Sequence, residues 1–75
     1  MRFVIKHESK GRIRVHMVQN RMSYRQADIL CYYLQNISGV TSAKVYENTS
    51  DAMVTYTCGR SEVISAFKKF AYDKV

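Results

Sequence analysis

The sequence contains no proline, and only three glycines (Gly11, Gly39 and Gly59) interrupt its 75 residues. It shows no linker, internal repeat or low-complexity stretch, so we expect a single domain over residues 1–75. A chain of this length buries only about 60% of its unfolded surface, which leaves little room for an enclosed active site. The length therefore favours a binding or regulatory domain over an enzyme.

Long apolar runs and cysteines are also scarce. The longest apolar run, Ile29–Leu34, is far shorter than the roughly 20 residues that span a bilayer. No apolar signal-peptide core follows Met1. The two cysteines, Cys31 and Cys58, form no Cys-x-x-Cys pair and are too few for a disulfide framework. We expect both to be reduced and buried as small hydrophobic residues, in a cytosolic protein.

Acidic residues are scarce in the first third of the chain. Residues 1–26 contain one acid, Glu8, and seven basic residues, whereas residues 27–75 contain five acids and five basic residues. The formal net charge of +6 therefore lies entirely in the first third. Such a concentration of charge favours an anionic partner.

Four segments have the composition of β-strands. The first two, over residues 3–7 and 12–17, flank a polar turn that ends at Gly11, which is typical of a hairpin. The other two, over residues 41–47 and 52–58, flank a turn rich in Asn, Thr, Ser and Asp.

The strand over residues 12–17 alternates strictly between apolar and polar side chains. Its inward positions are Ile13, Val15 and Met17, and its outward positions are Arg12, Arg14 and His16. In the strand over residues 52–58, the inward positions are Val54, Tyr56 and Cys58, and the outward positions are Met53, Thr55 and Thr57. If these strands are neighbours, the sheet has a cationic face open to water, which Arg2 and Lys6 join from the edge strand.

Two helices complete the pattern. Ser23 and Gln26 match a capping box at the start of the first helix, and Gly39 is its expected C′ residue. Ser61 is the expected N-cap of the second helix. The order ββαββα predicts an α+β fold, a ferredoxin-like two-layer α/β sandwich in which two helices cover one face of one antiparallel sheet.

The usual ferredoxin-like order is βαββαβ, in which a last strand lies beside the first. Only residues 72–75 follow the second helix here, so we expect the strand over residues 2–7 to fill that edge in a permuted topology. We also expect a crossover through the first helix to join the strand over residues 12–17 to the one over residues 52–58.

The second half of the chain resembles a known family. Ile37-Ser38-Gly39-Val40, followed by Val45 and by Val54-Thr55-Tyr56, is similar to the core of heavy-metal-associated (HMA) domains. In those domains a helix ends at Leu-Pro-Gly-Val, and the next hairpin carries Val-Asn and Val-x-Tyr elements. With Gly11-Arg12-Ile13-Arg14-Val15 ahead of this core, the chain resembles, over roughly residues 2–71, a divergent branch at the N-termini of bacterial heavy-metal-transporting P-type ATPases.

The resemblance implies a site for Cu(I) or Zn(II), on the cytosolic side of the inner membrane. Metal-binding members carry Met-x-Cys-x-x-Cys in the loop before the first helix. That loop contains no cysteine here, so these ligands do not carry over. The remaining weak metal candidates are His16, Met17 and Met22, because thioethers suit Cu(I). Alternatively, Met17 belongs to the core, Met22 is a hydrophobic staple of the helix, and the nearby arginines repel cations.

The sequence offers little that points to catalysis. The acids are scattered, His7 and His16 lack an evident nucleophile partner, and the glycines do not match a phosphate-binding loop. We therefore expect no enzymatic activity from the domain itself.

The residues expected to bind an anionic partner are Arg12, Arg14, His16, Arg21 and Arg25. Three partners fit: an acidic protein surface such as the remainder of a P-type ATPase, anionic lipid head groups, or nucleic acid. Nucleic acid is disfavoured, because RNA recognition on such a sheet needs exposed aromatic residues on the central strands. Alternatively, the arginines only solvate the sheet and prevent edge aggregation. We expect a cytosolic docking domain with a regulatory role; a small nucleic-acid-binding protein is the second candidate.

Overall fold

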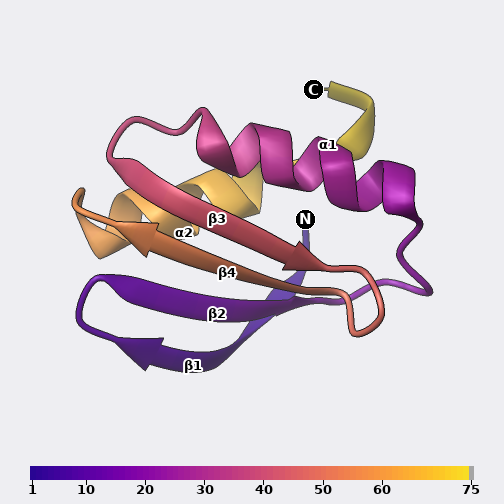
Figure 1. Cartoon of the computed structure of the whole chain (residues 1–75), viewed down its shortest axis with the longest axis horizontal. Coiled ribbons are helices and arrows are strands. Elements are labelled where there is room, and N and C mark those ends of the chain that lie inside the picture. The colour runs from indigo at the N-terminus through magenta and orange to yellow at the C-terminus, as the bar shows by residue number, and fades with distance from the viewer. Residues whose placement is uncertain (75) are drawn as a thin grey trace.

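A computed structural model describes residues 1–74. Its elements are β1 (Phe3–Ser9), β2 (Arg12–Met17), α1 (Tyr24–Gln35), β3 (Val40–Tyr46), β4 (Asp51–Tyr56), α2 (Arg60–Lys69) and a 3-10 turn at Tyr72–Lys74. The predicted order ββαββα is confirmed (Figure 1). Within the described residues, neither helix has the length and apolar character that a membrane crossing requires.

The four strands form one sheet in the order β1-β2-β4-β3, and all neighbours are antiparallel. The predicted edge position of the first strand is confirmed, because β1 pairs with β2 while residues 72–74 form a 3-10 turn. The alternative was that residues 72–75 pair with β2 in place of the first strand; Val75, the last of them, lies outside the described residues. The predicted crossover was wrong in its destination. The chain passes from β2 through α1 to β3, which runs parallel to β2 with β4 between them.

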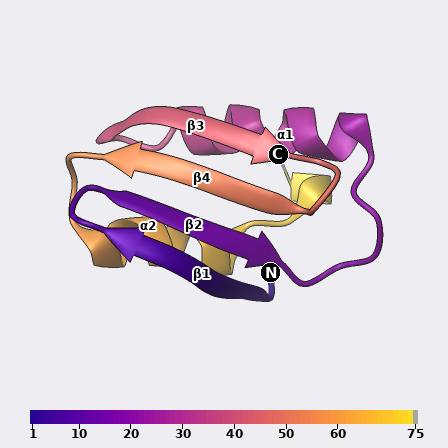
Figure 2. The same ribbon diagram turned by 60° about the horizontal axis from the view of Figure 1, so that its bottom comes forward.

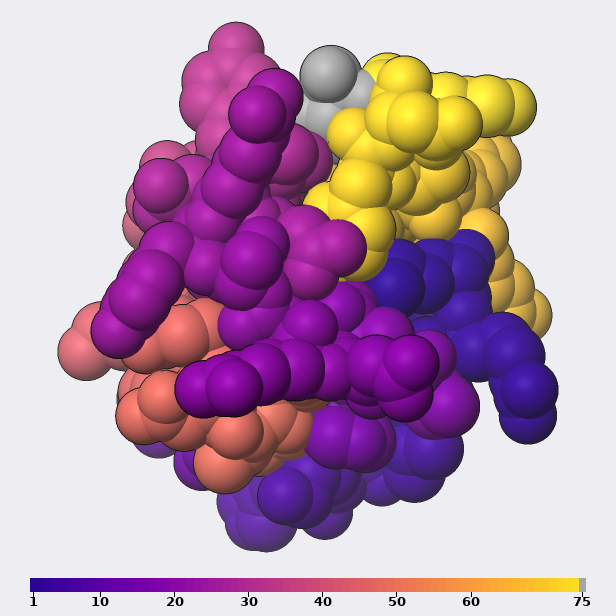
Figure 3. Space-filling view, turned by 90° about the vertical axis from the view of Figure 1, so that its right-hand side faces the viewer, coloured from indigo at the N-terminus to yellow at the C-terminus, as the bar shows by residue number. Residues whose placement is uncertain are grey.

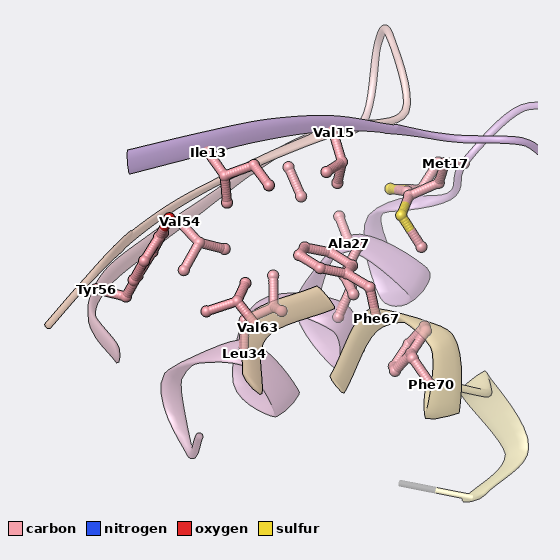
Figure 4. Packing of buried hydrophobic residues seen from close by; sticks show 13 residues of the cluster. Ile13, Val15, Met17, Ala27, Leu34, Val54, Tyr56, Val63, Phe67 and Phe70 are labelled. Atoms are coloured by element: carbon pink, nitrogen blue, oxygen red, sulfur yellow. The ribbon is translucent and has the colours of Figure 1, made fainter. Parts of the chain in front are cut away.

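The molecule has two layers. Both helices lie behind the sheet in Figure 2, so one face of the sheet is covered and the other is open. The core lies between the layers, and Figure 4 shows Ile13 and Val15 of β2 directed toward Val63 and Phe67 of α2. Tyr56 is buried in this cluster, as the alternation predicts.

The start of α1 follows the sequence prediction. The Ser23 hydroxyl accepts a hydrogen bond from the Gln26 backbone N–H, and the Gln26 side-chain oxygen accepts one from the Ser23 backbone N–H, each at 3.1 Å. Met22, just before this cap, is buried in the core cluster together with Ala27. The capping box therefore fixes both the first residue of α1 and the direction in which the loop enters it.

Several element ends differ from the prediction, and three of these differences concern the helix caps and the open face of the sheet. α1 ends at Gln35 with Asn36 as its C-cap, so Gly39 is not the C′ residue and instead takes a positive φ of 92° just before β3. α2 begins one residue before Ser61, with Gly59 as an N-cap that has no side-chain hydrogen bond. β4 begins at Asp51, one residue earlier than expected, and this places a carboxylate in the sheet.

Candidate functional site

The sheet face that no helix covers, called the open face below, carries most of the charged strand positions. Its basic residues are Lys6, Arg12, Arg14 and Lys44, and its two histidines are His7 and His16. The only acid among the strand positions on this face is Asp51, which lies opposite His16 in the β2–β4 pair. Basic side chains therefore outnumber carboxylates by four to one on a surface open to solvent.

Asp51 is buried although it lies on the open face, and only 1% of its side chain is exposed. Three neighbouring side chains cover it. His16 Nδ1 lies 2.9 Å from its Oδ1, and both Lys6 Nζ (3.3 Å) and Arg14 Nη2 (3.2 Å) donate to its Oδ2. These three side chains remain 40–50% exposed, so their charges reach the solvent while the carboxylate does not. We call these four residues the Asp51 cluster.

The cluster keeps Asp51 ionised. Burial by itself raises the pKa of the Asp51 carboxyl, because a charged carboxylate loses its hydration. Hydrogen bonds from His16, Lys6 and Thr49, together with the positive charge of Lys6, outweigh this effect and hold the pKa below its ordinary value. At neutral pH the carboxylate is therefore a fixed negative charge beneath three donors.

Lys6 reaches Asp51 because β1 is irregular. The register between β1 and β2 shifts between Ile5 and His7, so Lys6 is an extra residue in the edge strand. His7 pairs with Arg14 and therefore faces the open side, and Lys6 bonds to Asp51 on that same side. A bulge redirects side chains in this way, and here it places two consecutive basic residues on one face.

Arg14 makes a second contact on the open face. Its guanidinium carbon lies 5.0 Å from the ring centroid of Tyr46, which is within the range of a cation–π contact. Tyr46 faces Asp51 across the β3–β4 pair, so the ring borders the Asp51 cluster. The Arg14 side chain is thereby held from two sides, by the carboxylate and by the ring.

The structure divides the five predicted docking residues into two groups. Arg12, Arg14 and His16 lie together on the open face. Arg21 and Arg25 are not on the open face; Arg21 lies in the loop before α1 and Arg25 in the first turn of α1. Arg21 lines a hollow of about 410 Å³ between this loop and the β3–β4 turn. Figure 3 shows the same loop, in purple, lying against that turn, in salmon.

The three weak metal candidates do not converge. Alternation along β2 places His16 on the open face and Met17 on the core face, and Met22 is buried in the same core. Among residues 1–74, no group of three or more His, Cys, Asp or Glu side chains has a metal-binding arrangement. The part of the chain that the structure describes therefore contains no set of ligands like the one that metal-binding HMA domains use.

The two cysteines are less buried than expected. Cys31 and Cys58 are both free thiols and both only partly buried. Burial raises the pKa of each thiol, and the carboxylates of Asp28 near Cys31 and of Glu62 near Cys58 raise it further. Both are therefore predominantly protonated at neutral pH and poor metal ligands or nucleophiles.

Sequence reasoning missed Asp51 and Lys44. The segment Asn48–Asp51 has strong turn composition, which hides the fact that Asp51 already belongs to β4. The missed signal is the alternation itself, because Asp51 precedes the outward residues Met53 and Thr55 by two and four positions.

Comparisons of this sequence with protein-family models and with curated proteins find no match. The basis for assigning a function is therefore the chemistry of the open face.

Proposed function

We propose that the chain is a non-catalytic docking domain that binds an acidic protein surface through the open face. The supporting observation is that, among the described strand positions of this face, Lys6, Arg12, Arg14 and Lys44 stand beside a single carboxylate, Asp51, which is covered by its neighbours. An approaching partner therefore meets positive charge. Such a surface steers an acidic partner into contact and fixes its orientation.

The Asp51 cluster adds preorganisation to this charge. Long basic side chains lose conformational entropy when they are immobilised at an interface. Lys6 and Arg14 already hydrogen-bond to Asp51, and Arg14 also stacks on Tyr46. Part of the ordering has thus taken place before the partner arrives, which favours docking on this face over an equally charged but mobile surface.

The open face suits an acidic protein better than single-stranded nucleic acid. Base recognition on a sheet of this kind uses exposed aromatic rings on the central strands. The central strands β2 and β4 present no Phe, Tyr or Trp on the open face, and their one imidazole, His16, is bonded to Asp51. Their outward positions are Arg12, Arg14, His16, Asp51, Met53 and Thr55. The aromatic residue on this face, Tyr46, lies on the edge strand β3, and Arg14 covers its ring.

The resemblance to HMA domains supports a narrower form of the proposal. In that form the partner is the remainder of a heavy-metal-transporting P-type ATPase, and the domain regulates it from the cytosolic side of the membrane. The coding sequence after codon 75 tests this point. We expect it to encode membrane-spanning segments and an Asp-Lys-Thr-Gly-Thr phosphorylation motif. A stop codon directly after codon 75 would contradict the narrower form and leave the docking proposal intact.

Docking is tested with a synthetic Glu-Ser repeat peptide and its Gln-Ser counterpart, using NMR titration of the labelled protein. Of the two peptides, we expect only the Glu-Ser peptide to shift amide signals along β2, β4 and β1. Its affinity should decrease when the salt concentration is raised from about 50 to about 200 mM. The double variant Arg12→Gln, Lys44→Gln removes two open-face charges that form no side-chain hydrogen bond or ion pair within residues 1–74. It should lower the affinity by roughly tenfold.

The matched control is the double variant Lys68→Gln, Lys69→Gln, which removes the same charge from exposed positions on α2. It should bind the peptide with nearly unchanged affinity. Equal losses in the two double variants would show that net charge alone governs binding and would overturn the docking face. Tighter binding of a single-stranded oligonucleotide than of the peptide would favour the second candidate function.

A further inference from the structure

The open face contains a hollow beside the bulge in β1. A hollow of about 480 Å³ lies over β1 and β2, and it is open to solvent. Its lining residues are Lys6, His7, Ser9, Arg12, Arg14 and Met53. This volume is within the range of small-molecule sites. The bulge at Lys6 creates the hollow's donor-rich wall, because it turns both Lys6 and His7 toward the open side.

The donors around the hollow match one kind of ligand. Arg12 and Arg14 supply two guanidinium groups, and an ammonium, an imidazole and a hydroxyl come from the β1 residues. Within residues 1–74, the lining of the hollow contains no carboxylate. Arginine guanidinium groups bind the oxygens of phosphate in pairs, and hydroxyl and imidazole groups complete such sites. A carboxylate ligand offers only two oxygens to these five side chains, whereas a phosphoryl group offers three or more.

Two arginines in the hollow have donors to spare. Arg12 forms no side-chain hydrogen bond or ion pair within residues 1–74. Arg14 donates to Asp51 through Nη2, but its Nε is buried and has no acceptor in that part of the chain. Buried donors without partners are uncommon in native proteins. An oxygen-rich anion in the hollow is the kind of ligand that supplies acceptors to such unused arginine donors.

We propose that this hollow binds a phosphoryl group in solution, either inorganic phosphate or the phosphate end of a small phosphorylated molecule. Asp51 stands next to the hollow and opposes an anion there. Its carboxylate is covered, however, and Lys6 and Arg14 already neutralise it, while Arg12 adds a charge that is not shared. The apolar side chain of Met53 borders the hollow and suits the carbon skeleton of such a ligand.

The test is an NMR titration with sodium phosphate and with pyrophosphate at constant ionic strength, using sodium chloride as the reference salt. Saturable shifts at residues 6–9, 12–14 and 53 are expected with both phosphates, and pyrophosphate should bind more tightly. The variant Arg12→Gln should weaken phosphate binding about tenfold. Its control, Lys44→Gln, removes the same charge from the same face outside the hollow and should change the affinity less than about twofold.

Three results would overturn the site. If the chemical shifts change linearly with phosphate concentration and sodium chloride reproduces them, they report salt screening and not a site. If Arg12→Gln and Lys44→Gln lose the same phosphate affinity, general charge and not the hollow governs binding. Binding to phosphatidic acid vesicles without any binding of free phosphate would assign the chemistry to a lipid head group. The site is independent of the docking proposal. Saturable phosphate binding without peptide binding would contradict only the docking proposal. Peptide binding without saturable phosphate binding would contradict only the phosphoryl site.

Discussion

His16 and Asp51 are joined by a hydrogen bond of 2.9 Å between Nδ1 and Oδ1, across the two central strands of the sheet. The two residues lie directly opposite each other in the β2–β4 register, on the side that no helix covers. The hydrophobic core holds these strands together from the opposite side. Polar side chains on the open face therefore also link β2 to β4, and Asp51 positions the basic side chains around it.

Replacing Asp51 tests how much the cluster contributes to stability. Asp51→Asn removes the negative charge and leaves Lys6 and Arg14 crowded together without a carboxylate. We expect the free energy of unfolding at neutral pH to fall by about 1–3 kcal/mol, measured by urea denaturation. The lower part of the range reflects the solvent exposure of the partner side chains, which screens their charges.

The control for this variant is Asp73→Asn, which makes the same change at an exposed position in the 3-10 turn. It should alter the free energy of unfolding by no more than about 0.5 kcal/mol. Similar losses for the two variants would show that the Asp51 cluster does not stabilise the fold.

Acid should weaken the protein through the same carboxylate. The folded protein holds the pKa of Asp51 below its ordinary value of 3.8, so the unfolded chain takes up a proton more readily than the folded one. The resulting stabilisation is fully present above the unfolded pKa and is lost as the pH falls through the folded pKa. The free energy of unfolding of the wild type should therefore drop more steeply below about pH 4 than that of Asp51→Asn. Parallel curves for the two proteins would contradict this linkage.

The start of α1 offers a separate test. Ser23→Ala removes the hydroxyl that accepts from the Gln26 N–H, so it should lower the free energy of unfolding by about 1 kcal/mol. The paired variant is Ser61→Ala, at the serine that the sequence favours as the cap of α2. Because Gly59 is the N-cap there, Ser61→Ala should have little effect on urea denaturation. A larger loss from Ser61→Ala than from Ser23→Ala would contradict the observed helix starts.

Much of the fold could be predicted because its signals are local. Strict alternation over residues 12–17 identifies both faces of β2, and Ser23 with Gln26 marks the start of α1. The neighbourhood expected for residues 12–17 and 52–58 is confirmed, because β2 pairs with β4. The crossover was assigned wrongly because the strand that follows α1 in the chain, β3, is not the strand that pairs with β2; β4 is reached only through the β3–β4 turn and runs antiparallel to β2.

The candidate site was harder to predict for the same reason. His16 and Asp51 are 35 residues apart, and their contact depends on the β2–β4 register, which the sequence of neither strand specifies. The charge count in the first 26 residues groups Arg21 and Arg25 with Arg12, but a count of charges does not show on which face of the fold each side chain lies. The loop after β2 leads away from the open face to the β3–β4 turn, and two of the predicted docking residues go with it.

Gly39 provides the sharpest packing prediction. A Cβ at this position would lie 2.4 Å from the Cβ of Cys58, and the φ of 92° is unfavourable for any other residue. Gly39→Ala should therefore lower the free energy of unfolding by at least about 2 kcal/mol in urea denaturation. Gly59→Ala is the matched control, since its added Cβ meets nothing closer than 3.8 Å; a loss of only about 0.5–1 kcal/mol is expected there, because alanine is a poorer N-cap than glycine. Adding Cys58→Gly to Gly39→Ala removes the two closest atoms, leaves the Cα of residue 58 at 3.2 Å and keeps the strained φ. The double variant should therefore lose less stability than the sum of the two single losses. Equal effects of the two alanine variants would show that Gly39 is not confined by Cys58.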